Sequence, residues 1–290
     1  MTGSDKFFER ANTLLERLEH LVPATGTSAQ LEHHVAFRWQ VEGNHRELRP
    51  VNTLSPIRLE DLQCIDRQKS EIDRNTRQLL QDIPANHVLL WGPRGTGKSS
   101  LIKAVFNAYT EQGLRLIEVD KDHLVDLPRI IDLLHGHSGH FLIYCDDLSF
   151  ESDDPSYKAL KTIIDGSISQ TPSNILIYAT SNRRHLMPEY MKDNRESEMI
   201  NGELHLSETI EEKISLSERF GMWLSFHPFR QEEYLHIVDY WIKKMEHPVN
   251  DRDSLHKAAL KWALEHGSRS GRIASQFVND WIGRERLHQS

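Results

Sequence analysis

The sequence predicts an α/β fold in which a parallel sheet covered by helices is followed by a smaller, all-helical domain. Between residues 87 and 226, five short apolar runs alternate with amphipathic helical patterns, the order expected of βαβ units. A glycine-rich loop directly follows the first of these runs. From residue 230 onward the strand-like runs stop and three helical patterns fill the rest of the chain. These observations divide the chain into an α/β core and a helical C-terminal domain.

The composition is that of an ordinary globular protein. The 290 residues include 35 Lys and Arg against 43 Asp and Glu, and 38% are hydrophobic. The net charge of −8 argues against a protein that coats nucleic acid by bulk electrostatics. No apolar run approaches the ~18–20 residues of a membrane span, and the start lacks the pattern of a signal peptide. Cys64 and Cys145 are too few for a disulfide scaffold, so we expect a cytoplasmic protein with no membrane partner.

We expect three parts in chain order. Residues 1–56 form an N-terminal helical extension, because residues 5–22 place apolar side chains at helical spacing before Pro23. Residues 57–228 form the α/β core. Residues 229–290 form the helical C-terminal domain, which would lie against the core.

The individual elements follow from the period of their apolar residues. Short continuous apolar runs predict buried strands, and longer segments with a period near 3.6 predict helices. Strands are expected over residues 87–91, 114–119, 141–145, 174–180 and 222–226. Helices are expected over residues 57–83, 98–111, 124–134 and 157–168 in the core, and over 231–245, 254–266 and 273–284 after it.

The loop after the first strand matches the pattern G-x-x-x-x-G-K-[ST] and lies between an expected strand and an expected helix. Glycines let backbone N–H groups surround phosphate oxygens, and the helix N-terminus adds partial positive charge. Lys98 would reach the β- and γ-phosphates, and the Ser99 hydroxyl would bind Mg²⁺. The pattern therefore predicts that the chain binds a nucleoside triphosphate. The phosphate-binding residues would be Gly92, Pro93, Arg94, Gly95, Thr96, Gly97, Lys98, Ser99 and Ser100.

Two carboxylates follow the third expected strand. Asp146 and Asp147 come directly after the apolar run at 141–145, and open α/β sheets bind ligands at such strand ends. We expect Asp146 to hold Mg²⁺ through water and Asp147 to polarise the attacking water. ATPases of this kind usually place Glu at the second position, and Asp is one methylene shorter, so hydrolysis is expected to be slow. Glu151, slightly further along, is the alternative base.

Three later segments narrow the class. Residues 174–184 resemble the sensor-1 strand of the AAA+ ATPases, residues 215–221 their arginine-finger segment, and residues 267–274 their sensor-2 segment. The stretch from residue 57 to the end also resembles a bacterial family of AAA+ ATP-binding proteins with no assigned role, in which the acid pair ending in Asp147 is the usual pattern. The resemblance implies a five-stranded parallel sheet with a helical lid, and ATP and Mg²⁺ as ligands.

The resemblance also implies roles for single residues. Asn182 would orient the attacking water, with Ser181 beside it as the alternative. Arg219 would reach the ATP of a neighbouring subunit and stabilise charge in the transition state. Arg272 would contact the β- or γ-phosphate from the lid, with Arg269 as the alternative. Each role has a structural alternative. Asn182 would then belong to a turn at the end of a strand, Arg219 would complement a helix dipole, and Arg272 would be a plain surface arginine.

An arginine that acts on a neighbour requires an assembly, so we expect a nucleotide-dependent homo-oligomer, a ring or an open ring. The leading hypothesis is an AAA+ ATPase that hydrolyses ATP slowly and couples hydrolysis to movement of the lid and to a protein client. One alternative is a nucleotide-switched binding module or scaffold with little turnover. The other is a nucleic-acid loader or remodeller, which the net charge of −8 does not support.

Overall fold

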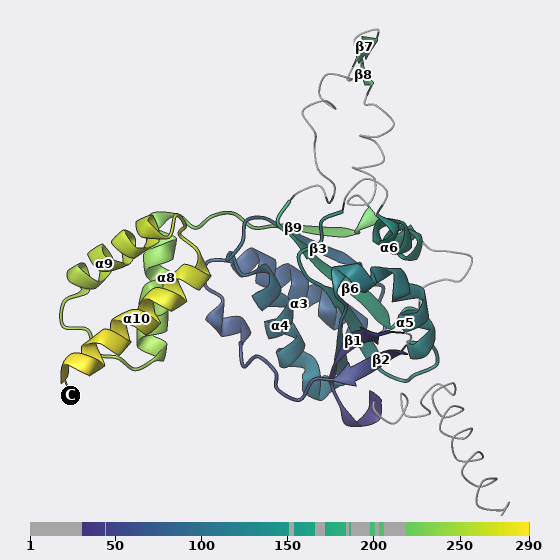
Figure 1. The fold of residues 1–290 in the computed structure, drawn as a ribbon, viewed down its shortest axis with the longest axis horizontal. Helices are drawn as coiled ribbons and strands as arrows, with labels where there is room; N and C mark the ends of the chain where they lie inside the picture. The colour runs from purple at the N-terminus through teal and green to yellow at the C-terminus, as the bar shows by residue number, and fades with distance from the viewer. Residues whose placement is uncertain are drawn as a thin grey trace, which may run out of the picture.

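The fold is described from a computed structural model (Figure 1). The structure describes residues 31–43, 45–150, 154–165, 172–183, 186, 198–200, 203–205 and 219–289. The helix expected over residues 5–22 and the alternative base Glu151 lie outside these residues.

A seven-stranded sheet forms the centre of the molecule, in the order β2-β1-β4-β5-β6-β3-β9. Neighbouring strands pair in parallel throughout, except for the antiparallel pair of β1 and β2. The five predicted strands are confirmed, and they form the continuous block from β4 to β9. The strands are β1 (Ala36–Glu42), β2 (His45–Pro50), β3 (Val88–Trp91), β4 (Leu114–Glu118), β5 (His140–Cys145), β6 (Ile175–Ser181) and β9 (Met222–Ser225).

The hairpin of β1 and β2 extends the sheet beyond the five strands that the resemblance implied. It also corrects the expectation of a helical extension, because residues 36–50 are strands that continue the core sheet. Phe37 and Trp39 are buried while Arg38 between them is exposed, which is the period of a strand. The signal was missed because β2 is an edge strand in which only Leu48 is buried, and polar edge strands lack an apolar run.

Helices cover both faces of the sheet (Figure 1). α3 (Asp66–Leu80) and α4 (Lys98–Tyr109) pack on one face, and α5 (Leu127–Leu134) and α6 (Pro155–Asp165) pack on the other. The single helix expected over residues 57–83 is instead two elements, because Cys64 adopts a left-handed backbone with φ 62° that no α-helix accommodates. Within the described residues of the core there are also three short 3₁₀ helices: η1 (Leu59–Asp61), η2 (Thr110–Gln112) and η3 (Lys121–Asp126).

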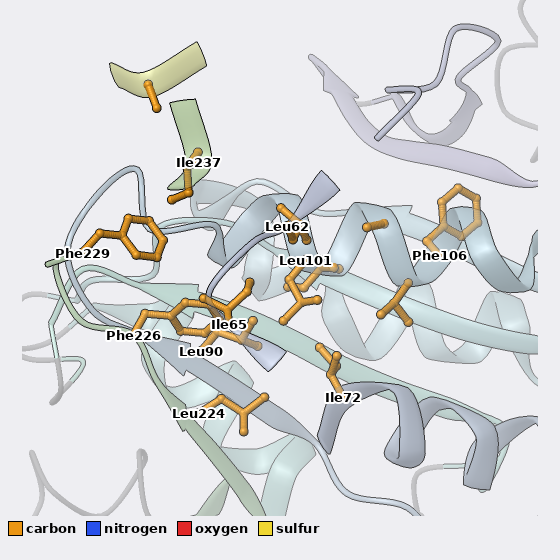
Figure 2. Packing of buried hydrophobic residues seen from close by; sticks show 14 of the residues in the cluster. Leu62, Ile65, Ile72, Leu90, Leu101, Phe106, Leu224, Phe226, Phe229 and Ile237 are labelled. Atoms are coloured by element: carbon orange, nitrogen blue, oxygen red, sulfur yellow. The ribbon is translucent and has the colours of Figure 1, made fainter. Parts of the chain in front are cut away.

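Two hydrophobic clusters hold these layers together, one on each face of the sheet. The cluster on the α3 and α4 face also continues into the C-terminal domain. Leu62 and Ile65, in the segment before α3, belong to the same cluster as Phe229 and Ile237 (Figure 2). Burial of these side chains therefore stabilises both the core and the position of the C-terminal domain beside it.

The C-terminal domain, which we call the lid, consists of three helices: α8 (Gln231–Lys244), α9 (Arg252–Glu265) and α10 (Gly271–Gln289). All three correspond to predicted helices. α8 begins where the Arg230 backbone N–H donates to the Glu233 carboxylate at 2.7 Å, and α9 is capped by Asp251, which accepts from the Ser254 N–H at 3.0 Å. A separate pair of short strands, β7 (Glu198–Ile200) and β8 (Glu203–His205), projects away from the core (Figure 1).

None of the helices that the structure describes is long and apolar enough to span a membrane.

Candidate nucleotide-binding site

A cleft of about 920 Å³ lies between the core and the lid. The predicted phosphate-binding loop (residues 92–100), the acidic end of β5 and residues from the segment 55–65 lie on its core side, and residues from α8 and α10 lie on its lid side. Such a volume is within the range of sites for drug-sized ligands and nucleotides.

The loop between β3 and α4 has the backbone shape of an anion-binding loop. Gly92 and Gly95 adopt φ values of 141° and 78°, which side-chain-bearing residues rarely accept. A Cβ on Gly92 would lie 2.2 Å from the Phe226 carbonyl oxygen, and a Cβ on Gly95 would lie 2.7 Å from the Ser270 hydroxyl. Both positions therefore require glycine for backbone shape and for space. The loop delivers the N-terminus of α4 to the cleft, where its free N–H groups favour a phosphate.

Lys98, the first residue of α4, is only 6% exposed. Its ammonium donates to the carbonyl oxygens of Gly92 at 2.6 Å and Pro93 at 2.8 Å, and to the Asn182 side-chain oxygen at 3.2 Å. Burial lowers the pKa of Lys98, and the nearby carboxylates of Asp146 and Asp147 act in the opposite direction. The ammonium is thus held at the base of the loop, where a phosphate oxygen would meet it.

Asp146 sits beside Ser99 at the end of β5. Its Oδ1 accepts hydrogen bonds from the Ser99 hydroxyl at 2.7 Å and the Thr180 hydroxyl at 2.5 Å. Burial raises the pKa of this carboxyl, but the hydrogen bonds from Thr180 and Ser99 outweigh burial and hold the pKa below its usual value. A hydroxyl and an ionised carboxylate are the hard oxygen donors that suit Mg²⁺, so the residues fit that ion.

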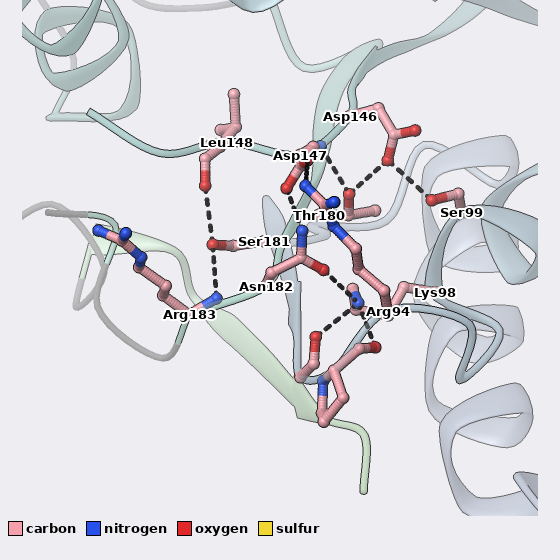
Figure 3. Close-up of polar contacts among 12 residues, drawn as sticks. Arg94, Lys98, Ser99, Asp146, Asp147, Leu148, Thr180, Ser181, Asn182 and Arg183 are labelled. Atoms are coloured by element: carbon pink, nitrogen blue, oxygen red, sulfur yellow. Dashed lines mark hydrogen bonds and ion pairs between the residues drawn. The ribbon is translucent and has the colours of Figure 1, made fainter. Parts of the chain in front are cut away.

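Asp147 adopts a left-handed backbone with φ 51°, and its N–H donates to the Thr180 hydroxyl at 2.9 Å. One carboxylate oxygen accepts from the Arg94 guanidinium at 3.0 Å, and the other accepts from the Asn182 amide. Because Asn182 in turn accepts from Lys98, four side chains form one continuous chain of contacts, Arg94–Asp147–Asn182–Lys98 (Figure 3). We call these four residues the loop relay, since both of its ends belong to the phosphate-binding loop.

The two sensor-1 alternatives point in different directions. Asn182 lines the cleft and contacts Asp147. Ser181 is fully buried, donates to the Leu148 carbonyl at 2.7 Å and accepts from the Arg183 N–H at 3.1 Å (Figure 3). The geometry therefore favours Asn182 as the residue that faces a ligand.

The three candidate arginines also differ in whether they line the cleft. Arg272 lines the cleft at the start of α10, whereas Arg269 is not among the lining residues. Arg219 lies outside the cleft and forms an ion pair with Asp165 at the end of α6, with 29% of its side chain exposed. Within one chain the cleft thus contains Arg272 but not Arg219.

Part of the cleft lining is an apolar wall, which consists of Ile57, Leu62, Ile65, Ile237 and Trp241. Beside this wall the buried carboxylate of Asp61 accepts from the Tyr240 hydroxyl at 2.6 Å and from the Lys244 ammonium. Burial raises the pKa of Asp61, but the Lys244 and Tyr240 hydrogen bonds prevail and lower it. This contact ties η1 in the core to α8 in the lid.

A family model described as "Protein of unknown function (DUF815)" matches residues 32–285, nearly the whole chain. The chain belongs to this family. No curated protein matches it.

Solved structures similar to this DUF815 protein show the class of its fold. Two variants of RuvB from Thermotoga maritima align with a TM-score of 0.55, at 14% and 16% identity. They cover 81% and 82% of this chain, which in turn covers 67% and 69% of theirs. The ORC1 protein of Aeropyrum pernix, solved in complex with DNA, aligns with a TM-score of 0.53 at 15% identity, covering 78% of this chain and 61% of its own. The fold of the DUF815 protein is that of the AAA+ ATPases.

Sequence reasoning missed several residues of the cleft. Thr180 donates to Asp146, and Asp61 pairs with Tyr240 and Lys244 from the lid. Tyr240 and Lys244 are four residues apart on a helix, so they share a face, but nothing in the sequence indicates that Asp61 lies opposite.

Proposed function

We propose that this DUF815 protein binds ATP with Mg²⁺ in the cleft between core and lid and hydrolyses ATP slowly. The observation that carries the proposal is the convergence of a complete phosphate-binding loop with Asp146, Asp147 and Asn182 in one cleft. The apolar wall of the cleft would take the adenine base. Arg272 would contact the phosphates from the lid.

Each residue has a part in an in-line attack of water on the terminal phosphate. Lys98 would neutralise charge on the transferred group, and Asp147 and Asn182 would orient the attacking water. Ser99 and Asp146 would hold Mg²⁺, which neutralises phosphate charge when bound. Turnover would be slow because Asp147 is shorter than Glu and one of its oxygens is held by Asn182.

Arg219 would act on the ATP of a neighbouring copy. Its place outside the cleft of its own chain supports this role, since a residue on that surface meets nucleotide only in an assembly. We infer a homo-oligomer whose formation depends on ATP. The lid would move with the nucleotide, because Gly271 of α10 donates to the Gly95 carbonyl at 3.0 Å and so links lid and loop directly.

The second candidate function is a nucleotide-switched binding module that assembles on ATP and captures a protein client with little turnover. The contacts of Asp147 with Arg94 and Asn182 favour this second function, because they occupy both carboxylate oxygens that would otherwise orient water. A role as a nucleic-acid loader has support only from the fold that is shared with an ORC1 protein solved with DNA, and the net charge of −8 opposes it.

Steady-state ATP turnover by the full chain tests the proposal, with Lys98→Ala and Arg219→Ala measured alongside. We expect measurable phosphate release that both substitutions abolish. Mass measurements with and without a slowly hydrolysed ATP analogue test the assembly. If ATP binds but no phosphate is released, the switch is the correct function. A monomer in both conditions at about 10–100 μM protein would exclude the role of Arg219 in trans.

A further inference from the structure

The phosphate-binding loop carries a second cation besides Lys98. Arg94 lies in the middle of the loop, its side chain is 77% exposed, and its guanidinium reaches across the cleft to Asp147 at 3.0 Å (Figure 3). We propose that Arg94 distinguishes nucleoside triphosphates from diphosphates by exchanging Asp147 for the terminal phosphate, which frees Asp147 only when a triphosphate is bound. This inference rests on the proposed function and extends it to a positioning residue.

The loop relay defines where this exchange takes place. Lys98 contacts Asn182, and Asn182 contacts Asp147, so a phosphate on the Asn182 side of Lys98 lies next to both. The guanidinium of Arg94 lines the same cleft and contacts the other oxygen of Asp147. A terminal phosphate that Lys98 holds there competes directly with the Asp147 carboxylate for Arg94. A diphosphate ends one group earlier and leaves the pair of Arg94 and Asp147 in place.

The energies permit the exchange. Both side chains are well exposed, 77% for Arg94 and 49% for Asp147, and exposed ion pairs contribute little to stability because water screens them. A phosphate offers a guanidinium two parallel charge-assisted hydrogen bonds and more negative charge than a carboxylate. Arginine suits this geometry better than lysine because its fork is planar.

The exchange also decides whether both carboxylate oxygens of Asp147 are bound to protein groups. With Arg94 on one oxygen and Asn182 on the other, the carboxylate is directed toward protein groups rather than toward water. Departure of Arg94 releases the oxygen that it held, which can then accept a hydrogen bond from the attacking water. A site of this design orients water only in the presence of the group that water attacks.

Two binding measurements with the full chain test the inference. The probes are a fluorescent, non-hydrolysable ATP analogue and fluorescent ADP. The variants are Arg94→Ala, Arg94→Lys, Asp147→Asn and the double variant. Arg74→Ala serves as the matched control, because Arg74 is also an exposed arginine in a surface ion pair, with Glu71 on α3, and does not line the cleft.

Arg94→Ala is expected to weaken binding of the ATP analogue by about threefold to tenfold and to leave ADP binding within about twofold. Arg94→Lys should retain part of the wild-type preference for the ATP analogue over ADP. Asp147→Asn should tighten binding of the ATP analogue when Arg94 is present, because it removes the competitor, and should have a smaller effect in the Arg94→Ala background.

Equal effects of Arg94→Ala on both nucleotides, or no effect on either, would overturn the inference, as would an Asp147→Asn effect of the same size in both backgrounds. These outcomes leave the proposed function intact. Failure of the wild-type chain to bind either nucleotide would overturn the proposed function and this inference with it.

Discussion

Gly271, the first residue of α10, donates its backbone N–H to the carbonyl oxygen of Gly95 in the phosphate-binding loop at 3.0 Å. Ser270 packs so closely against Gly95 that a Cβ there would lie 2.7 Å from its hydroxyl. The lid is therefore in backbone contact with the loop that would hold the phosphates. A change in the shape of the loop must displace the start of α10, and Arg272 next to it, by the same contact.

Gly95→Ala is expected to disrupt this contact. Alanine at φ 78° is strained, and its Cβ would also push Ser270 away, so we expect ATP affinity to fall by about tenfold or more. Equilibrium binding of an ATP analogue measures the loss. The control is Gly113→Ala, where φ is 88° but no atom lies within 4 Å of the added Cβ. It should lower the free energy of unfolding by about 1–2 kcal/mol and leave affinity unchanged. Equal affinities in the two variants would contradict the contact.

Tyr144→Phe is expected to leave the free protein as stable as the wild type or to stabilise it by up to about 1 kcal/mol. The Tyr144 hydroxyl is fully buried and meets the distance and angle of a hydrogen bond with no atom among the described residues, so its removal leaves no partner unsatisfied. Tyr178→Phe is the matched control, because the equally buried Tyr178 hydroxyl contacts Thr76 at 2.9 Å and Asn75 at 3.0 Å. That variant should lose about 1–2 kcal/mol. Urea denaturation measures both, and a larger loss for Tyr144→Phe would refute the prediction.

Stability should depend on pH through His87. The Nδ1 atom of this histidine accepts from the Ile177 N–H at 3.0 Å, and burial lowers its pKa from 6.5 to about 4. Between these two values the unfolded chain binds a proton that the folded chain does not, so stability falls as pH drops below 6.5. From pH 7 to pH 5 the loss attributable to His87 is about 2 kcal/mol.

His87→Asn tests this dependence, because the asparagine oxygen keeps an acceptor for Ile177 and does not titrate. Denaturant titrations at pH 7 and pH 5 should show a smaller difference between the two pH values than in the wild type. His135→Asn is the control, since His135 is exposed. An unchanged pH dependence in His87→Asn would show that other groups cause it.

The sequence predicted the part of the molecule that is encoded locally. β3, β5 and β6 are buried on both faces, so they appear as continuous apolar runs, and the phosphate-binding loop is contained in nine consecutive residues. Contacts between distant residues have no such signal. Asp61 and Lys244 are 183 positions apart, and Arg94 and Asp147 are 53 apart. In the sequence each of these four looks like an ordinary charged residue, because its partner is adjacent only in the folded chain.

The hairpin of β1 and β2 shows that secondary structure, too, can depend on contacts between distant residues that the local sequence does not indicate. Phe37 and Trp39 pack against the core, but their alternation spans only three residues and its partner β2 is mostly exposed. What fixes β1 as a strand is its parallel pairing with β4, about 80 residues later in the chain.

Asp147→Glu is expected to raise steady-state ATP turnover by roughly tenfold to a hundredfold with little change in KM. The added methylene brings the carboxylate closer to the attacking water, whereas Asp147 is short and one of its oxygens is held by the Asn182 amide. Phosphate release under saturating ATP measures the gain. Asp122→Glu controls for the same change at an exposed site in η3. A fall in turnover would mean that the site is fitted to the shorter acid, and that the partners of Asp147 orient it for catalysis rather than restrain it.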